Sequence, residues 1–181
     1  MIYSELPECD HPAVDLRPIA ASDLEDWFAY LSLPIVYEHT SWEIGSSADL
    51  ADYARAQSAA TPDSMLRLAI CSRSSGQLVG TVGFHSLWWR DRRAELAYDL
   101  HPSYWGKGIA THVASLMLRW AHRHVGINRV QATVLESNSR SHAVLRRCNF
   151  RREGSLREYR FVRGKPSAFA IYSHLASDGA A

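Results

Sequence analysis

The chain has 181 residues, 46% of them hydrophobic, and its 20 Lys/Arg against 19 Asp/Glu give a formal net charge of +1. This length suits one domain with a substantial core, and a near-neutral charge without a dense basic run disfavours a nucleic-acid-binding protein. The three widely spaced cysteines match neither a disulfide framework nor a metal motif, and the sequence shows no signal peptide and no apolar run that could cross a membrane. We therefore expect a cytoplasmic protein.

The first hundred residues predict strands and helices in alternation. Ser22 and Glu25 have the spacing of a capping box, which predicts a helix start. A turn at residues 75–76 lies between two apolar runs, which predicts a hairpin. The expected elements are a strand at 14–19, helices at 22–31 and 48–59, and strands at 66–71, 78–87 and 93–100.

The remaining residues continue this alternation. Apolar side chains recur at helical spacing after residue 108, and Asn138 or Ser139 can cap a further helix. A turn at residues 163–166 separates the last two strands. The expected elements are helices at 109–124 and 138–148 and strands at 129–135, 150–161 and 168–175. This order predicts one mixed α/β domain without repeats.

A glycine-rich turn stands between the expected central strand and the helix that follows it. Gly106 and Gly108 allow positive φ and a close approach of a ligand to the backbone. The helix N-terminus adds free N–H groups and partial positive charge, so we expect a phosphate-bearing ligand here. The position of Lys107 between the glycines does not fit a Walker loop, and a dinucleotide fingerprint would need three glycines.

The turn resembles the acyl-CoA loop of the GNAT N-acetyltransferases, whose pattern is Gln/Arg-x-x-Gly-x-Gly/Ala. Here the loop reads Trp105-Gly106-Lys107-Gly108-Ile109-Ala110. Trp in the first position is usual in the RimJ/RimL-type branch, the ribosomal-protein N-terminal acetyltransferases and their relatives. Blocks similar to that branch also occur at residues 94–102, 138–145, 149–154 and 170–175. Ordered blocks of this kind make the resemblance specific.

The resemblance implies a GNAT domain over residues 14–176, with an N-terminal extension (1–13) and a short tail (177–181). Its α+β fold is a twisted, mostly antiparallel sheet of about seven strands with helices on both faces. A bulge in the central strand splays it from its neighbour into a V and frees backbone groups near Asp99 and Leu100 for the pantetheine arm.

The implied co-substrate is acetyl-CoA, with no metal ion. The diphosphate would accept hydrogen bonds from the N–H groups of residues 106–110. The CoA-contacting residues would be Asp99, Leu100, Trp105, Gly106, Lys107, Gly108, Ile109, Ala110, Thr111, Asn138 and Ser141. His122 and His124 lie on different faces of one helix, which disfavours a metal site there.

Acetyl transfer to an amine needs a general base and a proton donor for the leaving thiolate. Glu95 is the first candidate base, because it interrupts an otherwise apolar strand where a carboxylate is costly unless it has a use. Pairing with Arg92 or Arg93 would be its structural alternative. Asp99 could instead hold the amine, and Glu136 is a weaker candidate base.

Ser141 matches the serine that this branch places near the CoA sulfur, so its hydroxyl is the candidate donor to the thiolate. Its structural alternative is a hydrogen bond to the backbone of the first helical turn. Tyr98 and Tyr104 are other hydroxyl donors, since many acetyltransferases use a tyrosine acid. Asn138 could both cap the helix and contact the pantetheine.

The acceptor would be a primary amine, on either a protein N-terminus or a small molecule. The candidate acceptor contacts are Tyr37, Glu38, Trp42 and Trp88. The ribosomal branch has a carboxylate where this chain has Arg160, with Glu158 two residues earlier on the same face, and an Asp where this chain has Ala168. These departures weaken the inference that the substrate is a ribosomal protein, but they do not weaken the assignment of the CoA-binding loop.

Charge is divided unevenly along the chain. Residues 1–100 hold 7 Lys/Arg against 15 Asp/Glu, a balance of −8, and residues 101–181 hold 13 against 4, a balance of +9. This division fits a polyanionic ligand on the second half and a cationic acceptor facing the first, or simply two halves that neutralise each other. The sequence leaves open a homodimer and a CoA-binding module without catalysis.

Overall fold

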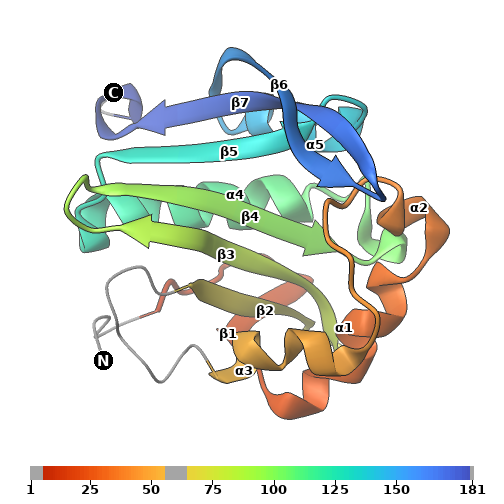
Figure 1. Cartoon of the computed structure of the whole chain (residues 1–181). Helices are drawn as coiled ribbons and strands as arrows, with labels where there is room; N and C mark the ends of the chain where they lie inside the picture. Colours follow the sequence, from red (N-terminus) through yellow and green to blue (C-terminus); the bar gives the residue numbers. More distant parts are fainter. Residues whose placement is uncertain (1–5, 56–64, 180–181) are drawn as a thin grey trace.

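The computed structural model describes residues 6–55 and 65–179 and contains a seven-stranded sheet in the order β1-β2-β3-β4-β5-β7-β6 (Figure 1). The strands are β1 (Val14–Pro18), β2 (Leu66–Ser72), β3 (Leu78–Trp88), β4 (Arg93–Leu100), β5 (Arg129–Leu135), β6 (Arg151–Val162) and β7 (Lys165–Leu175). Neighbouring strands are antiparallel except β4 and β5, which run parallel. The predicted α+β fold is confirmed.

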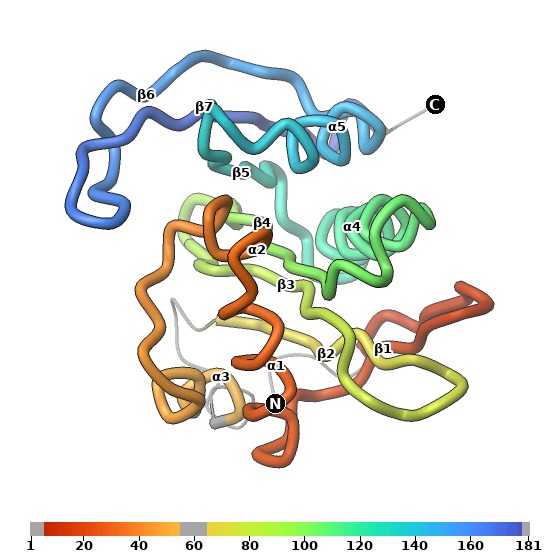
Figure 2. The backbone as a smooth tube through the Cα atoms, turned by 90° about the vertical axis from the view of Figure 1, so that its right-hand side faces the viewer, coloured from red at the N-terminus to blue at the C-terminus, as the bar shows by residue number. Residues whose placement is uncertain are grey.

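Helices cover both faces of the sheet (Figure 2). They are α1 (Leu24–Leu31), α2 (Pro34–Tyr37), α3 (Ala51–Arg55), α4 (Ile109–Trp120) and α5 (Ser139–Arg147). Figure 2 shows α4 and α5 on one side of the sheet and α1, α2 and α3 on the other. The short α2 was not predicted from the sequence.

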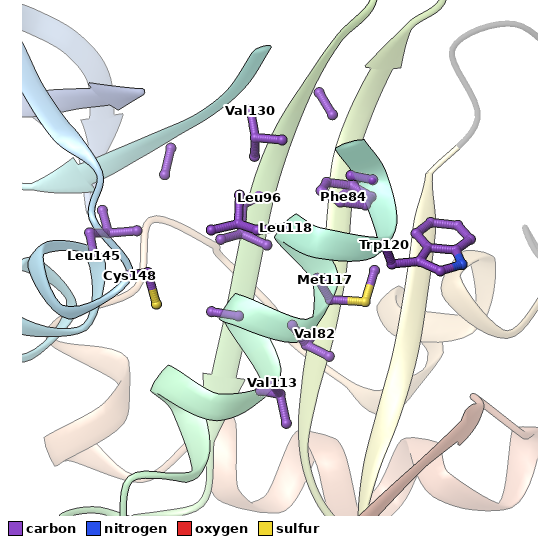
Figure 3. Packing of buried hydrophobic residues seen from close by; sticks show 14 of the residues in the cluster. Val82, Phe84, Leu96, Val113, Met117, Leu118, Trp120, Val130, Leu145 and Cys148 are labelled. Atoms are coloured by element: carbon purple, nitrogen blue, oxygen red, sulfur yellow. The ribbon is translucent and has the colours of Figure 1, made fainter. Parts of the chain in front are cut away.

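The main core lies between the sheet and α4 (Figure 3). Val113 and Met117 of α4 point toward β3 and β4 and are fully buried, as is Leu145 of α5. Trp120 stacks on Phe84 of β3 with ring centroids 6.5 Å apart. Because this packing fixes α4 against the sheet, it also fixes the N-terminus of α4 beside the end of β4.

β4 and β5 pair only over their first residues. The parallel pairs are Arg93 with Arg129, Ala94 with Val130, and Glu95 with Gln131. From there on β4 has β3 as its sheet neighbour, and the half of the sheet with β5, β7 and β6 turns away from it (Figure 2). The predicted V is therefore present, and it opens at Glu95.

The register irregularity beside the V lies in β3. Phe84 pairs with Leu96 and Ser86 pairs with Glu95, so His85 is an extra residue in β3. The predicted bulge in the central strand itself is therefore wrong in its position. A bulge bends its strand and re-aims its side chains, and here it changes which way His85 points.

The first helix also starts differently from the prediction. A 3₁₀ turn at Ala21–Asp23 precedes α1, and the Asp23 carboxylate accepts a hydrogen bond of 2.7 Å from the Ala20 N–H. Arg17 donates two hydrogen bonds to the same carboxylate, at 2.6 and 2.7 Å. The capping box of Ser22 and Glu25 was therefore wrong, because the ion pair with β1 fixes the chain at Asp23 instead.

Other boundaries shift by a few residues. The second helix is a 3₁₀ turn at Ser47–Leu50 followed by α3, and residues 56–59 of the prediction lie outside the described residues, as do 1–5 and 180–181 of the predicted termini. The helical residues after α4 form a π-turn at Ala121–Val125. β7 begins at Lys165, because the hairpin turn needs only Arg163 and Gly164, at φ 51° and 70°.

Candidate functional site

A cavity of about 830 Å³ follows the V between β4 and β5. At one end its walls come from residues 104–106 and 108–112 and from α5. At the other end they come from residues 35–36 and 39–42, β4, β5 and the side chains of Arg67, His85 and Arg160. This volume is in the range of small-molecule sites. The cavity therefore joins the glycine-rich loop to the buried carboxylates of β4.

The loop end presents backbone N–H groups. Gly106 and Gly108 have φ of 74° and 77°, and a Cβ at either position would meet no atom within 4 Å. α4 begins at Ile109, so the N–H groups of its first turn lack intrahelical acceptors. The positive φ values and the open space make the loop a cradle that fits a phosphate group.

Trp105 anchors this loop to the central strand. Its indole N–H donates a hydrogen bond of 2.7 Å to the Leu100 carbonyl, and the Arg140 guanidinium lies 4.4 Å from its ring centroid. The Leu100 carbonyl therefore already accepts one hydrogen bond from the loop. Lys107 lies outside the cavity lining, with its ammonium 5.1 Å from the Tyr104 ring centroid.

The backbone groups that face the V alternate along β4. The His101 N–H donates to the Val79 carbonyl, and the antiparallel pattern then also directs the backbone groups of Asp99 toward β3. The alternate residues Leu96, Tyr98 and Leu100 direct theirs toward the V. Of the two residues expected to offer backbone groups to the pantetheine, Leu100 thus faces the V and Asp99 faces β3.

The Asp99 carboxylate is engaged as well. It accepts hydrogen bonds from Arg67 at 2.5 Å, Thr81 at 2.6 Å and the Trp27 indole at 3.1 Å, and a further one from the Tyr30 hydroxyl. Arg67 is 2% exposed and also donates to Thr81. Burial and the Asp99 charge raise the pKa of Tyr30. This network ties β2, β3, β4 and α1 together, so Asp99 is not a free group that could hold an amine.

Glu95 lies at the point where the V opens and is 8% exposed. Thr133 of β5 donates a hydrogen bond of 2.7 Å to its Oε1, and the Arg160 guanidinium lies 3.5 Å from the same oxygen. Among the described residues, the hydrogen bond to this carboxylate goes to Oε1 and none goes to Oε2. The expected alternative pairing with Arg92 or Arg93 does not occur. One oxygen is thus held in place and the other is available to a ligand.

Two further side chains at this end were not predicted as functional. His85 lines the cavity and stacks on Trp42 with ring centroids 5.9 Å apart. Burial lowers its pKa and the charge of Arg67 adds to the effect, so His85 is neutral at pH 7. Arg160, which stands where the ribosomal branch has a carboxylate, also lines the cavity. The sequence pointed to Arg160 only through its position in the alignment with the ribosomal branch, and it contained no comparable indication for His85.

The candidate proton donors lie on the opposite wall. Ser141 lines the cavity, and its N–H donates to the Asn138 side chain at 3.0 Å, so Asn138 caps α5 as expected. The Tyr98 hydroxyl donates to the Ser141 carbonyl at 3.3 Å, and burial raises the pKa of Tyr98. The Tyr98 proton is thus already used in a hydrogen bond to the backbone, whereas the Ser141 hydroxyl lies in the cavity lining. Tyr104 also lines the cavity.

Several other candidates lie away from the cavity. Glu136 pairs with Arg152 at 2.9 Å, and hydrogen bonds from Ser155 and Arg152 lower its pKa, so it is not placed to act as the base. Trp88 packs under the Arg93 guanidinium, 4.0 Å from its ring centroid. Of the predicted acceptor contacts Tyr37, Glu38, Trp42 and Trp88, the cavity lining includes Trp42.

Tyr37 and Glu38 belong instead to a strap, residues 37–42, that is tied to the β6–β7 turn. Arg163 in this turn donates hydrogen bonds to the carbonyls of Tyr37 at 2.8 Å, Glu38 at 2.9 Å and Thr40 at 3.2 Å. The contact joins the two halves of the sheet beside the end of the cavity that contains Glu95, which we call the acceptor end (Figure 1). His39, Thr40, Ser41 and Trp42 of the strap line the cavity.

Among residues 6–55 and 65–179, no three His, Cys, Asp or Glu side chains cluster as a metal site would require. His122 contacts His174, with 3.1 Å between ring nitrogens. Cys9, Cys71 and Cys148 are free and buried, and burial raises the pKa of each thiol. None of the helices in the described part of the chain has the length and apolar character of a membrane span.

Comparison with known proteins assigns the chain to a family and identifies relatives of similar sequence. Residues 14–151 match the family model of the acetyltransferase (GNAT) domain. The chain is 35% identical over 108 residues to the uncharacterized N-acetyltransferase YoaA of Bacillus subtilis, a match over 60% of this chain and 61% of that protein. The chain thus spans less than two thirds of that relative's length.

Solved structures of similar fold include the ribosomal-protein-S5-alanine acetyltransferase of Vibrio fischeri, with a TM-score of 0.82 and 16% identity over 94% of this chain and 97% of that one. The microcin C7 self-immunity acetyltransferase MccE, in complex with acetyl-CoA and AMP, has a TM-score of 0.77 and 20% identity over 91% of this chain and 93% of that one. At these identities the likeness shows the fold.

Proposed function

The chain belongs to the GNAT acetyltransferase family, and from this premise we propose that it transfers an acetyl group from acetyl-CoA to a primary amine by direct attack in a ternary complex. The observation that carries the proposal is the cavity that connects the glycine cradle with Glu95 through the V. Such a cavity can hold a long donor and an acceptor at once. A CoA-binding module without catalysis would not need a buried carboxylate with a free oxygen at its inner end.

The cradle and its surroundings fit the CoA part of the donor. Gly106, Gly108 and the first turn of α4 offer N–H groups to a diphosphate. Arg140 and Arg147 of α5 also line the cavity and add positive charge at this end. The backbone groups of Leu96 and Tyr98 are available to the pantetheine arm along the V. Acetyl-CoA supplies the activated acyl group as a thioester.

The remaining residues act at the attacking amine and at the departing thiolate. As the amine nitrogen bonds to the thioester carbon and the C–S bond breaks, Glu95 Oε2 accepts the proton that the amine loses, directly or through water. The Ser141 hydroxyl donates a hydrogen bond to the departing thiolate, which then takes up a proton from water. Thr133 and Arg160 hold Glu95 Oε1, which keeps the carboxylate oriented during the reaction. The Glu95 and Ser141 roles predicted from the sequence are thus compatible with their positions.

Acetyl-CoA should raise the melting temperature of the protein, by about 5–10 °C at 100 times its Kd. Gly108→Trp should abolish this shift, because a large side chain at φ 77° would occupy the cradle. Gly76→Trp is a matched control, since Gly76 lies at φ 72° in open space outside the cavity. Thermal unfolding with and without acetyl-CoA measures the effect. A full shift in Gly108→Trp would contradict the assignment of the cradle.

A further inference from the structure

The acceptor end of the cavity contains an ion pair whose two members both face the ligand space. Glu95 and Arg160 line the cavity, 3.5 Å apart between Arg160 Nη2 and Glu95 Oε1. This distance is longer than a direct hydrogen bond, so the guanidinium keeps donors for another acceptor. The Arg160 side chain is 32% exposed and that of Glu95 is 10% exposed. A ligand in the cavity would thus meet one positive and one negative group side by side.

Arg160 reaches this position because β6 is irregular. Leu156 pairs with Phe169 and Arg160 with Ser167, so the intervening residues of β6 form a bulge, with Glu158 at φ 51°. Glu158 is exposed, which corrects the expectation that it shares a face with Arg160. The Arg160 guanidinium lies 5.6 Å from the Phe169 ring centroid, so cation–π packing holds it in place.

The other charges at this end do not favour a polycationic acceptor. The Asp99 carboxylate is engaged by Arg67, Thr81 and two further donors. Because Arg67 and Asp99 neutralise each other, Arg160 is the charge that lies beside Glu95 in the cavity lining. A polyamine would need a second carboxylate for its second ammonium group, but it would meet Arg160 instead. A ligand with one amine and one anionic group fits this set of charges.

The strap also favours a small acceptor. Arg163 fixes the strap to the β6–β7 turn through three backbone carbonyls, which narrows the acceptor end on this side. The first residue of a polypeptide carries a peptide carbonyl in place of a carboxylate, so it lacks an anionic group for Arg160. Trp42 and Phe169 of the lining offer aromatic surface to an apolar side chain.

We propose that the acceptor is a free α-amino acid, whose carboxylate binds Arg160 while its amine lies at Glu95 Oε2. The two groups of an α-amino acid are separated by one carbon atom, which matches the adjacent members of the ion pair. This inference rests on the proposed acetyl transfer and names its acceptor class. Arg160 is the specificity residue, and an apolar or aromatic amino acid fits the lining best.

The test compares amino acids with their amides as acceptors. L-phenylalanine, L-leucine and L-methionine and the corresponding amides are incubated with acetyl-CoA, and free CoA thiol is measured to obtain kcat/KM. Wild-type protein should prefer each acid over its amide by about 10- to 100-fold, the worth of a hydrogen bond to a charged group. The amine of the amide has the lower pKa and is deprotonated more easily, so chemistry alone would favour the amide.

Arg160→Gln should remove the preference for the acid. Any effect of this variant on Glu95 changes the rates of acid and amide alike, so the ratio of the two isolates recognition of the carboxylate. Arg160→Lys should retain part of the preference, and Arg157→Gln, an exposed position on the same strand outside the cavity, should retain all of it.

Three outcomes would overturn the proposal: amides, peptides or spermidine used as well as the acids, an unchanged ratio in Arg160→Gln, or no turnover of any acid by protein that acetyl-CoA stabilises. The first two include turnover and so concern the acceptor alone, and the third does so when the protein acetylates another amine such as spermidine or a peptide. If acetyl-CoA fails to shift the melting temperature, the proposed acetyl transfer itself is wrong.

Discussion

Glu95→Gln should lower kcat by about 10²- to 10⁴-fold, the usual contribution of a general base. Glutamine has nearly the same shape and can still accept the hydrogen bond from Thr133 through its amide oxygen. Its nitrogen would replace Oε2 and could not take a proton from the amine. Steady-state assays of CoA release give kcat. The acetyl-CoA-induced shift in melting temperature should stay within about 1 °C of wild type, because Glu95 lies where β4 and β5 separate whereas the cradle follows the other end of β4.

Glu136→Gln is the matched control for this variant. Glu136 also follows a strand of the V, but it lies outside the cavity and pairs with Arg152 at the surface. Its replacement should change kcat by less than about twofold, since exposed ion pairs contribute little. Turnover by Glu95→Gln at the wild-type rate would exclude Glu95 as the base. His85→Asn would then become the next variant, because the neutral His85 imidazole lines the same end of the cavity.

The loop and its helix could be predicted because their determinants are local. Gly106 and Gly108 precede an amphipathic segment, and positive φ at the two glycines and a helix start at Ile109 follow from neighbouring residues alone. The succession of strands and helices along the chain also followed from the spacing of apolar residues and the turns between them. The carboxylate of Glu95 was noticed for a similar reason, since a charged residue in an apolar strand is conspicuous without any knowledge of its partners.

The sequence could not predict which side chains lie beside Glu95 at the acceptor end, because irregularities in β3 and β6 determine their positions. Simple alternation places Glu158 and Arg160 on one face, but the bulge in β6 exposes Glu158 and leaves Arg160 in the cavity. The extra residue in β3 likewise decides where His85 lies. A shift of one residue reverses the face of a side chain, and no residue type in these strands marks such a shift.

The charge of the acceptor could not be read from composition either. The acidic first half of the chain fits a cationic acceptor on average, yet its Asp99 is engaged by Arg67 of that same half. Arg160 comes from the basic half and crosses the V to Glu95. What a ligand meets therefore depends on which charges are already paired, and contacts between distant elements determine this pairing.

Asp99→Ala should lower the free energy of unfolding by about 3–5 kcal/mol, the usual cost of leaving a buried charge without its partner. Arg67 is 2% exposed and would keep its charge in the interior, and Thr81, Trp27 and Tyr30 would each lose an acceptor. Urea denaturation followed by circular dichroism measures the effect. The same substitution at Asp15, whose pair with Arg73 is exposed on both sides, should cost less than about 1 kcal/mol.

A double variant separates burial of charge from loss of packing. Arg67→Met combined with Asp99→Leu removes both charges and keeps most of the volume, so it should recover a large part of the stability that Asp99→Ala loses. A loss below about 1 kcal/mol in Asp99→Ala would contradict the network as a structural element. Recovery of stability in the double variant would show that the cost in Asp99→Ala comes from the unpaired charge of Arg67, and no recovery would show that it comes from lost packing.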